Sequence, residues 1–444
     1  MTTVLLFVVG VLVMVVGLAL SIALHEVGHL VPAKRFGVKV GQYMIGFGPT
    51  IFSRRRGETE YGVKALPLGG YISMAGMFPP GRAGGEARTA STGFFQTLVQ
   101  DARTASADTI DPGDEQRTFY RLPVAKRIVI MLGGPVMNLL IGVVLYAVLL
   151  CGFGTAQYSS TLGSVSECVL PAGATATSCP ADAETAPAAA AGLRPGDRLV
   201  SIDGDEVTDG DQVTAILRAS PGEDLEVVYE RDGARATTTL TPQLSERYVT
   251  DDATGRVVEG DDGEPVTQEV GFVGIGFATE TVQRPVTAVL PTVGENVVRV
   301  ADLIVHLPQR LVGVADAAFG GGEREADGPV SVVGVGRMAG EIASLDAVPL
   351  ADRAAYLVGL LANLNVALFV FNLIPLMPLD GGHVLGAVIE GVRRAFAKLL
   401  RRPDPGPVDT AKVIPLTFAV VAVLGAMSVL LIYADIVNPI DIFG

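Results

Sequence analysis

Positive charge is scarce in this sequence, and so is charge of any kind. Lys and Arg number 33 against 47 Asp and Glu, which gives a formal net charge of −14 in 444 residues. Because no basic face is available to neutralise phosphates, the sequence argues against nucleic acid as a partner. Charged residues make up 18% of the chain and hydrophobic residues 49%. That balance is too apolar for an ordinary soluble enzyme and indicates a membrane protein with soluble parts.

Cysteine is rare as well, with three residues in the chain. Cys151 lies in an apolar run, where a free cysteine is usually a small core residue. Cys168 and Cys179 lie close together in a polar segment, and they could pair if that segment is extracytoplasmic. The sequence cannot test the geometry that a disulfide requires, so this pairing stays open.

A cleavable leader is not expected at the start of the chain. The apolar run Val4–Leu24 is too long for a signal-peptide core, and it lacks a basic start because the first Lys is Lys34. Three further apolar runs approach the length that a bilayer about 30 Å thick requires, and four such runs argue against buried core helices. We therefore predict an α-helical polytopic membrane protein with about four transmembrane helices, in residues 1–32, 128–153, 355–385 and 413–434.

The orientation of these spans follows from Lys and Arg, which cluster in the two loops 33–127 and 386–412. Because basic loops stay on the cytoplasmic side, both loops are predicted to be cytoplasmic. This topology places both termini and the long segment between the second and third spans outside, and the acidic stretches of that segment agree with it. The chain is therefore expected to be a multi-pass protein of the cell membrane, in contact with the lipid bilayer.

The first loop, 33–127, has two parts. Its beginning alternates strand formers with glycine, which is typical of β-hairpins, and it is apolar enough to lie on the membrane or dip into it. From Pro79 to Gln116, small and charged residues predict a flexible segment. Residues 281–350 contain a helical periodicity with few charges, so we expect an amphipathic segment along the membrane surface there.

The outer segment 156–280 has the pattern of a compact β-rich domain. A turn at Pro195-Gly196-Asp197 leads into a strand at Arg198–Ile202, and the segments Leu225–Arg231 and Ala234–Leu240 form a hairpin. The order Gly-Leu-x-Pro-Gly-Asp-x-Leu-x-x-Ile-Asp-Gly-Asp resembles a PDZ domain. We therefore predict an extracytoplasmic PDZ domain here, with an unrelated β-sandwich as the alternative.

The first span carries an HExxH motif on its last turns, made by His25, Glu26 and His29. Residues four apart lie on one face of a helix, so the two histidines can bind one metal ion. Glu26 projects beside them, where it can take a proton from a water at the metal. Ionisable residues inside a membrane helix are costly and are functional by default. The alternative is a pair of interfacial histidines at a helix end.

Zinc needs a third protein ligand, with the fourth position left for water. Soluble proteases of the HExxHxxGxxH type would need Gly at 32 and His at 35, but this chain has Pro32 and Arg35. The best source is Asn372–Leu385, NLIPLMPLDGGHVL, in which prolines and glycines interrupt the third span. Asp380 has no Lys or Arg nearby in this stretch, and a zinc ion would supply the missing charge. An interfacial turn aspartate is the alternative.

Taken together, these motifs resemble the bacterial site-two proteases. They are HExxH on the first span, the Gly-rich hairpin, Gly133–Leu139 (GGPVMNL) on the second span, the PDZ-like domain, and N-x-x-P-x-x-P-L-D-G-G on the third. The resemblance is strongest to the actinobacterial branch that cleaves membrane-bound anti-sigma factors. It implies an intramembrane zinc metalloprotease that cuts a single-span membrane protein after a site-one-type protease has trimmed it. It also implies a Zn²⁺ site with Glu26 as the catalytic base and three metal ligands, His25, His29 and Asp380.

The same resemblance suggests residues that hold the substrate. Asn372 matches an asparagine of the third-span motif, and Asn365 is a second candidate whose spacing one sequence cannot confirm. The end of the family's membrane hairpin is matched by Gly69, Gly70 and Tyr71. Small residues are also expected to pack the second span against the catalytic helices, namely Gly133, Gly134 and Asn138.

Other functions and roles remain as alternatives. A zinc transporter can also carry HExxH-like sequences, but it needs several ligand-bearing helices and usually more spans. A non-catalytic scaffold built around the PDZ-like domain is a second alternative, against which the intact Glu26 argues. His383 could be a ligand by residue type, but the family assigns it no such role. The outer domain could bind a newly exposed C-terminus by strand addition, or exclude bulky substrates by size, which we favour.

Overall fold

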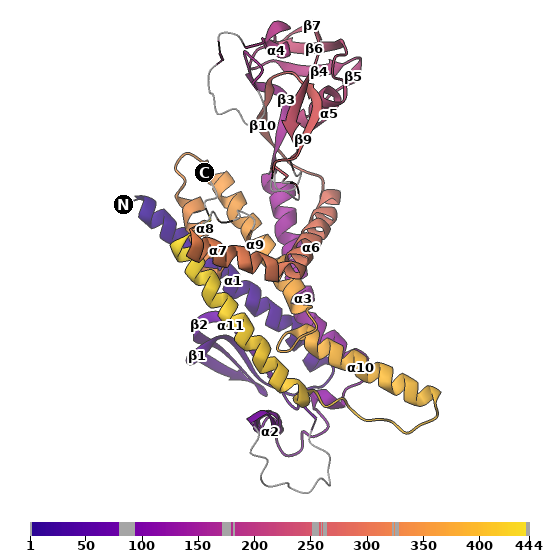
Figure 1. Cartoon of the computed structure of the whole chain (residues 1–444). Coiled ribbons are helices and arrows are strands. Elements are labelled where there is room, and N and C mark those ends of the chain that lie inside the picture. Colours follow the sequence, from indigo (N-terminus) through magenta and orange to yellow (C-terminus); the bar gives the residue numbers. More distant parts are fainter. Residues whose placement is uncertain are drawn as a thin grey trace. The chain divides into compact units, whose positions relative to one another are not determined.

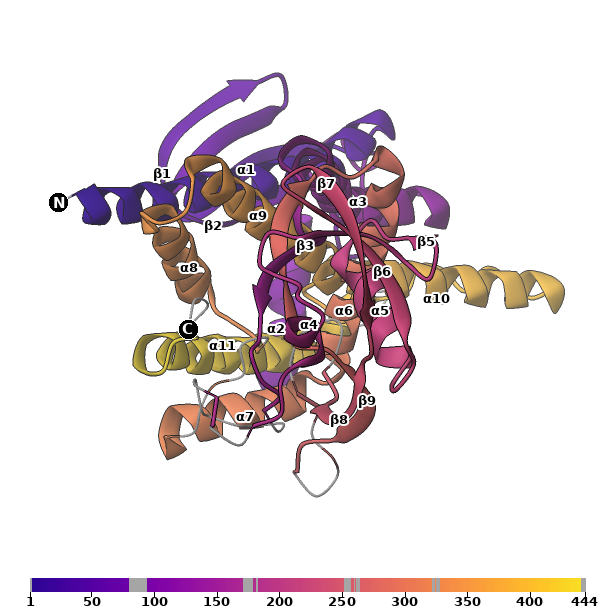
Figure 2. The same cartoon turned by 90° about the horizontal axis from the view of Figure 1, so that it is seen from above.

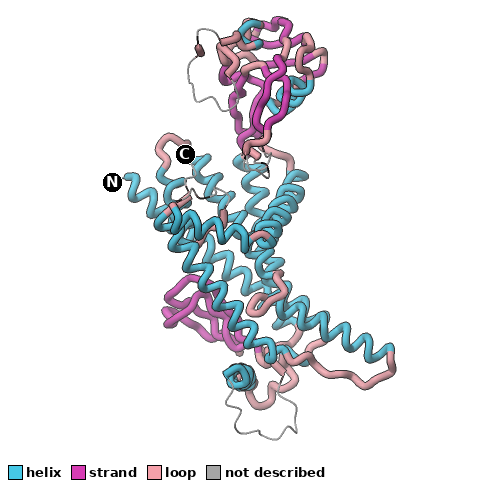
Figure 3. Tube along the Cα trace, in the orientation of Figure 1, coloured by secondary structure: helices cyan, strands magenta, loops and turns pink. Residues whose placement is uncertain are grey.

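The computed structural model of the protein separates into two compact units. One unit contains residues 1–153 and 285–444, and the other contains residues 154–284. Helices make up most of the first, which we call the helical unit, whereas strands dominate the second, the β unit (Figures 1 and 3). The structure describes residues 2–79, 94–170, 179–180, 183–250, 257–258, 260, 264–321, 324 and 328–440.

Four helical segments among the described residues are long and apolar enough to cross a membrane. They are α1 (Thr2–Arg35), α3 (Val124–Ala147) with the π-helical turn η2 (Val148–Phe153), α9 (Leu350–Asn372), and η4 (Thr410–Val413) with α11 (Ile414–Val437). Few of their side chains are buried inside the unit, as expected for helices that face lipid. These helices, together with the sheets, agree with the prediction of a polytopic membrane protein that has a β region.

The third span differs from the predicted helix 355–385. α9 ends at Asn372, and a loop with Pro375 and Pro378 follows it, because proline cannot continue a helix hydrogen-bond ladder. A new helix, α10 (Asp380–Leu399), then begins and projects away from the other helices (Figures 1 and 2). The segment 386–412, which was expected to be a loop, is therefore helical over its first half. Its basic residues occupy one face of a helix whose other face is apolar.

The segments that connect the spans contain further helices. The segment 281–350, predicted to be amphipathic and helical, contains α6 (Val289–Val305), α7 (Leu307–Gly320) and α8 (Val332–Ser344). One face of α8 packs on α1, where Ala339 is fully buried against Gly10, while Val332 and Val333 are exposed. Within the segment 79–116, the described part forms α2 (Phe94–Ala107), while residues 80–93 lie outside the described residues.

The predicted membrane hairpin is formed by two long antiparallel strands beside α1. They are β1 (Val40–Arg56) and β2 (Thr59–Met74), which pair along most of their length. The pairing is irregular between residues 40 and 52, and Phe47, Ile51 and Phe52 in and near this part are exposed apolar side chains. Val40, Tyr43 and other buried side chains form a core shared with α1, which holds the hairpin next to the last turns of that helix.

The β unit is built around one six-stranded sheet with strand order β10-β3-β4-β6-β7, on which β5 pairs with β4. Two short helices and a separate β8–β9 pair accompany it. The predicted strand Arg198–Ile202 and the hairpin Leu225–Arg231 with Ala234–Leu240 are confirmed as β4, β6 and β7. The remaining elements are β3 (Thr155–Val165), α4 (Pro187–Ala190), β5 (Asp205–Glu206), α5 (Gly210–Ala219), β8 (Gln243–Tyr248), β9 (Thr267–Phe272) and β10 (Ile275–Val282).

Two local features hold the β unit together. The β6–β7 turn places Asp232 and Gly233 at φ 53° and 78°, a left-handed conformation that the Asp-Gly pair favours in tight hairpins. The pairing that the sequence left open is present, since Cys168 and Cys179 form a disulfide with a Cα–Cα distance of 5.9 Å. Cys151 is a free, half-buried cysteine in the helical unit.

An ion pair with a buried carboxylate joins the turn before β4 to the end of β6, where the Arg231 side chain is 29% exposed. Asp197 is 1% exposed, and its two carboxylate oxygens each accept a hydrogen bond of 2.7 Å from the guanidinium of Arg231. The backbone N–H of Arg194 donates a third, also at 2.7 Å. Burial alone would raise the pKa of the Asp197 carboxyl, but these three hydrogen bonds to the charged form bring its pKa below the ordinary value of 3.8.

The charged Asp197 should therefore stabilise the β unit at neutral pH and lose this effect in acid. With a lowered folded-state pKa, its contribution is present above the unfolded-state pKa and disappears as the pH falls through the folded-state pKa. Asp197→Asn should lower the free energy of unfolding by about 1–3 kcal/mol at pH 7. Pulse proteolysis of the full-length protein in urea measures this. The difference from wild type should shrink below about pH 4.

Glu230→Gln is the matched control, because the Arg198–Glu230 pair lies on the same sheet but is exposed to solvent. Exposed pairs contribute about 0–1 kcal/mol, so its urea midpoint should stay near that of wild type. An Asp197→Asn protein as stable as the Glu230→Gln protein would show that the buried pair gives no extra stability.

Candidate metal centre

The two histidines of the HExxH motif lie one turn apart on α1, with their rings edge to face. Their Nε2 atoms are 3.2 Å apart. Nδ1 of His29 lies 2.7 Å from the carbonyl oxygen of Ile130 on α3. Since a carbonyl can only accept a hydrogen bond, this Nδ1 must carry the ring proton. That contact orients the ring and leaves the Nε2 lone pair of His29 free to bind a metal ion.

Asp380 is the first residue of α10 and lies against both histidines. Its Oδ2 is 3.4 Å from Nε2 of His25 and 3.3 Å from Nε2 of His29. The loop after α9 makes this approach possible, because it ends one helix and redirects the chain before the next begins. The structure thus brings together the three residues that the sequence predicts as ligands, from segments that lie more than three hundred residues apart.

The spacing of these three atoms fits a zinc ion. Bonds of about 2.05 Å from zinc to tetrahedral ligands would place neighbouring ligand atoms about 3.3 Å apart. The three separations here are 3.2, 3.3 and 3.4 Å. Two imidazole nitrogens and one carboxylate oxygen are also a donor set that zinc accepts in catalytic sites, where the fourth position stays open. The residues present could therefore hold zinc with room for a water or a substrate oxygen.

A glycine on α3 leaves the space that this arrangement needs. A Cβ on Gly134 would lie 2.2 Å from Nε2 of His29 and 2.7 Å from Nε2 of His25, so any side chain there would displace the rings. The expectation that small residues pack the second span against the first is confirmed at this position. The role of Ile130 was missed, because a backbone carbonyl leaves no signal in the sequence.

Glu26 and the hairpin lie side by side at the centre. The Glu26 side chain is buried on the same turns of α1 as the histidines. Gly70 of β2 packs so closely that a Cβ there would come within 3.1 Å of Glu26 Cγ. Its neighbour Gly69 has a φ of +95° and faces the ring of Phe47, while the Tyr71 hydroxyl donates to Gln42 at 3.2 Å. The three hairpin residues singled out from the sequence therefore run past the candidate base.

The two asparagines of α9 are placed differently from each other. The side chain of Asn372 is partly exposed and donates to the carbonyl of Leu368 in its own helix at 3.0 Å. Asn365 is 0% exposed and donates to the hydroxyl of Ser21 on α1 at 3.0 Å. Its amide thus joins two helices and does not face an open surface. His383 lies outside the three-atom group, with its ring 6.4 Å from that of Phe78.

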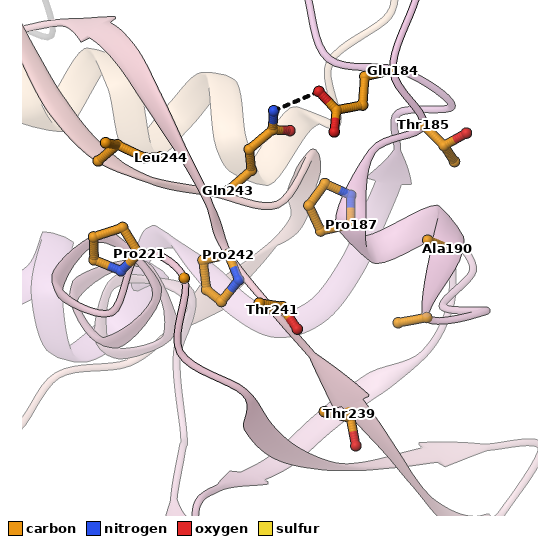
Figure 4. A pocket seen from close by; sticks show the side chains of 12 residues that line it. Glu184, Thr185, Pro187, Ala190, Pro221, Thr239, Thr241, Pro242, Gln243 and Leu244 are labelled. Carbon is orange, nitrogen blue, oxygen red and sulfur yellow. Dashed lines mark hydrogen bonds between the residues drawn. The ribbon is translucent and has the colours of Figure 1, made fainter.

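A cavity of about 640 Å³ lies elsewhere, on the surface of the β unit (Figure 4). It is lined mainly by proline, alanine and threonine side chains near α4 and the start of β8. Its one carboxylate, Glu184, accepts a hydrogen bond of 2.7 Å from the amide of Gln243. The lining contains neither histidine nor cysteine, so it offers no ligand set for a transition metal.

The sequence is similar to those of known proteins. Residues 13–400 match the family described as Peptidase family M50. The chain is 33% identical over 461 residues to the zinc metalloprotease Rip1 of Mycobacterium tuberculosis, covering 99% of this chain and 100% of the relative. It is 31% identical over 450 residues to Rip1 of Mycolicibacterium smegmatis, with the same coverage. Metalloprotease MmpA of Caulobacter vibrioides is 27% identical over 403 residues, which are 87% of this chain and 88% of the relative.

Removing the aspartate should empty the centre. We expect Asp380→Ala to carry far less than one zinc ion per chain, because the metal loses one of three protein ligands and its only anionic one. Metal analysis of the purified full-length protein measures this. His383→Gln is the matched control on the same turn of α10, and it should keep its zinc. Full zinc occupancy in Asp380→Ala would contradict this ligand set. A loss of zinc in His383→Gln would indicate that His383 is a ligand.

Proposed function

Since the chain belongs to peptidase family M50, the site-two zinc metalloproteases, we propose that its zinc ion is held by His25, His29 and Asp380. Glu26 is the catalytic base. The single observation that carries this assignment is the spacing of the three ligand atoms, 3.2 to 3.4 Å, which matches the edges of a zinc-centred tetrahedron. The reaction is the hydrolysis of a peptide bond in or near a membrane span.

Several residues of the chain have separate roles in this hydrolysis. When bound, the zinc ion polarises the scissile carbonyl and makes a water more acidic. Glu26 takes a proton from the attacking water and then delivers it to the amine that leaves. The Ile130 carbonyl keeps His29 in the tautomer that presents Nε2. Gly134 keeps the space around both rings open.

The substrate is proposed to be a single-span membrane protein, an anti-sigma factor that another protease has already trimmed. A peptide bond within a helix is protected because its carbonyl is hydrogen-bonded, so the substrate must be held in an extended form. The position of Gly70 beside Glu26 supports entry along the hairpin, with Gly69 and Tyr71 next to it. The partly exposed Asn372 is a further contact for that strand. Buried Asn365 is a weaker candidate.

The centre is proposed to lie toward the cytoplasmic side of the cell membrane. α1 ends in Lys34 and Arg35 a few residues after the HExxH motif, and α10 carries two arginines and one lysine beyond Asp380. Such basic ends stay in the cytoplasm. The β unit is then extracytoplasmic, which agrees with its disulfide. Its strand and turn order support a PDZ-like domain that excludes untrimmed substrates by size.

Glu26→Gln should abolish cleavage while the protein keeps its zinc and its fold. Glutamine has nearly the same shape as glutamate, but it cannot accept the proton of the attacking water, and this position is not a ligand. General acid–base groups contribute about 10²–10⁴-fold to rate, so turnover should fall by at least that factor. The measurement combines a cleavage assay on a single-span substrate in detergent with metal analysis. Turnover near the wild-type rate would rule out Glu26 as the base.

Deleting the β unit tests the proposed filter. Replacing residues 154–284 with a short linker should leave the cleavage of trimmed substrate intact, because all the groups of the metal centre lie in the helical unit. Untrimmed substrate should then also be cut. Immunoblots of both substrate forms in cells report this, once the shortened protein is shown to accumulate in the membrane. Continued protection of the untrimmed form, with the trimmed form still cut, would exclude the size filter.

A further inference from the structure

A buried ion pair joins the two helices that flank the metal centre. Arg127 lies on α3 and is 6% exposed, whereas Glu390 lies on α10 and is fully buried. Nη2 of Arg127 is 2.5 Å from Oε1 of Glu390. The same carboxylate receives a hydrogen bond of 3.0 Å from the backbone N–H of Val408, and Nη2 of Arg394 lies 3.1 Å from it. Three segments of the helical unit therefore meet at Glu390.

The α3 side of this pair supports the histidines. Ile130, which accepts the hydrogen bond from His29, comes three residues after Arg127 on the same helix. Gly134, which packs against both histidine rings, follows one turn later. A shift of α3 along its axis would thus move both supports of the two histidine ligands together.

The α10 side of the pair carries the third ligand. Asp380 opens α10, and Glu390 follows ten residues later, about 15 Å along the same helix. The loop before Asp380 contains two prolines and gives no regular hydrogen-bond ladder to α9. Gly381 packs on the carbonyls of Leu373 and Ile374 in this loop, which holds the first turn of α10 locally. The contacts of α10 with α3 then set the direction of the helix and its register against the histidines. Besides the ion pair, Gly391 packs against Val124 at the start of α3.

We propose that Arg127 and Glu390 are positioning residues that keep Asp380 in register with His25 and His29. The inference rests on the ligand set proposed above. Apolar helix contacts tolerate sliding, because one methyl group replaces another at little cost. The buried pair favours a single register, since a slip of α3 against α10 would leave the guanidinium of Arg127 buried without Glu390. The pair thus fixes the register of α3 against α10, and with it the position of Asp380 relative to the two histidines.

A second buried ion pair in the same unit provides a matched control. Arg324 contacts Asp435 of α11, and both side chains are about as buried as the first pair. Asp435 also accepts a hydrogen bond of 2.7 Å from the backbone N–H of Ser331, just before α8. α8 packs on α1 at Gly10, fifteen residues and about 22 Å along the helix before His25. This pair can stabilise the helical unit, and among the described residues its other polar contacts are with the backbone of Pro329 and Ser331, not with α3 or α10.

The test compares zinc affinity in the full-length protein for wild type, Glu390→Gln and Asp435→Asn. Competition with a chelator of known affinity gives the zinc Kd. Residues that orient metal ligands change metal affinity about ten- to hundredfold when replaced, so Glu390→Gln should raise the Kd by that factor. Asp435→Asn should keep the wild-type Kd, although both substitutions should lower the thermal unfolding midpoint.

Three further measurements separate positioning from a loss of stability. Glu390→Gln should recover cleavage at saturating zinc, which an unfolded protein cannot do. The double variant Arg127→Gln/Glu390→Gln should raise the Kd no more than the larger single effect, because the two residues act as a unit. Arg127→Lys retains the charge, and so the fold, and should show a smaller shift in the same direction.

Either of two results would overturn the inference. One is a wild-type zinc Kd in both Glu390→Gln and Arg127→Lys, and the other is an equal loss of affinity in Glu390→Gln and Asp435→Asn. A wild-type protein that binds no zinc would instead overturn the proposed ligand set, and with it this inference, so the two failures can be told apart.

Discussion

The cost of placing ionisable groups inside a bundle of apolar helices governs this structure. Two imidazole nitrogens and a carboxylate oxygen lie within 3.4 Å of one another, on side chains that are 6–17% exposed and therefore poorly screened by water. A divalent cation would offset that cost, because it could bind all three and supply the charge that Asp380 lacks in its own sequence neighbourhood. Without such an ion, the burial of Glu26 beside this group would add a further penalty.

The elements around the metal centre each contribute something that this site requires. On α3, Gly134 has no side chain, which leaves space for both histidine rings, and the carbonyl of Ile130 orients the ring of His29. The break between α9 and α10 lets an aspartate enter from a different helix. The β1–β2 hairpin runs past the proposed base, where an extended substrate could add to it. A zinc ion held by these three residues would keep a fourth position for a water or a substrate oxygen.

The sequence predicted those features that depend on residues close to one another along the chain. The i, i+4 histidines, the prolines before Asp380 and the Asp-Gly turn of the β unit all indicate structure within a few residues. The extension of α10 was missed because its basic residues resemble a loop when the apolar face opposite them is ignored. The Ile130 carbonyl and the Arg127–Glu390 pair depend on tertiary contacts between distant segments. Neither has a signature at any fixed spacing.

Zinc K-edge X-ray absorption on the full-length protein, purified with its metal, tests the central claim most directly. The structure predicts two imidazole nitrogens at about 2.0–2.1 Å and oxygen ligands at about 2.0–2.2 Å, with no sulfur. Multiple scattering from the imidazole rings would identify the two histidines. A sulfur shell at about 2.3 Å would assign the metal to Cys151, the free cysteine, and contradict the account. A spectrum with no imidazole scattering would contradict it equally.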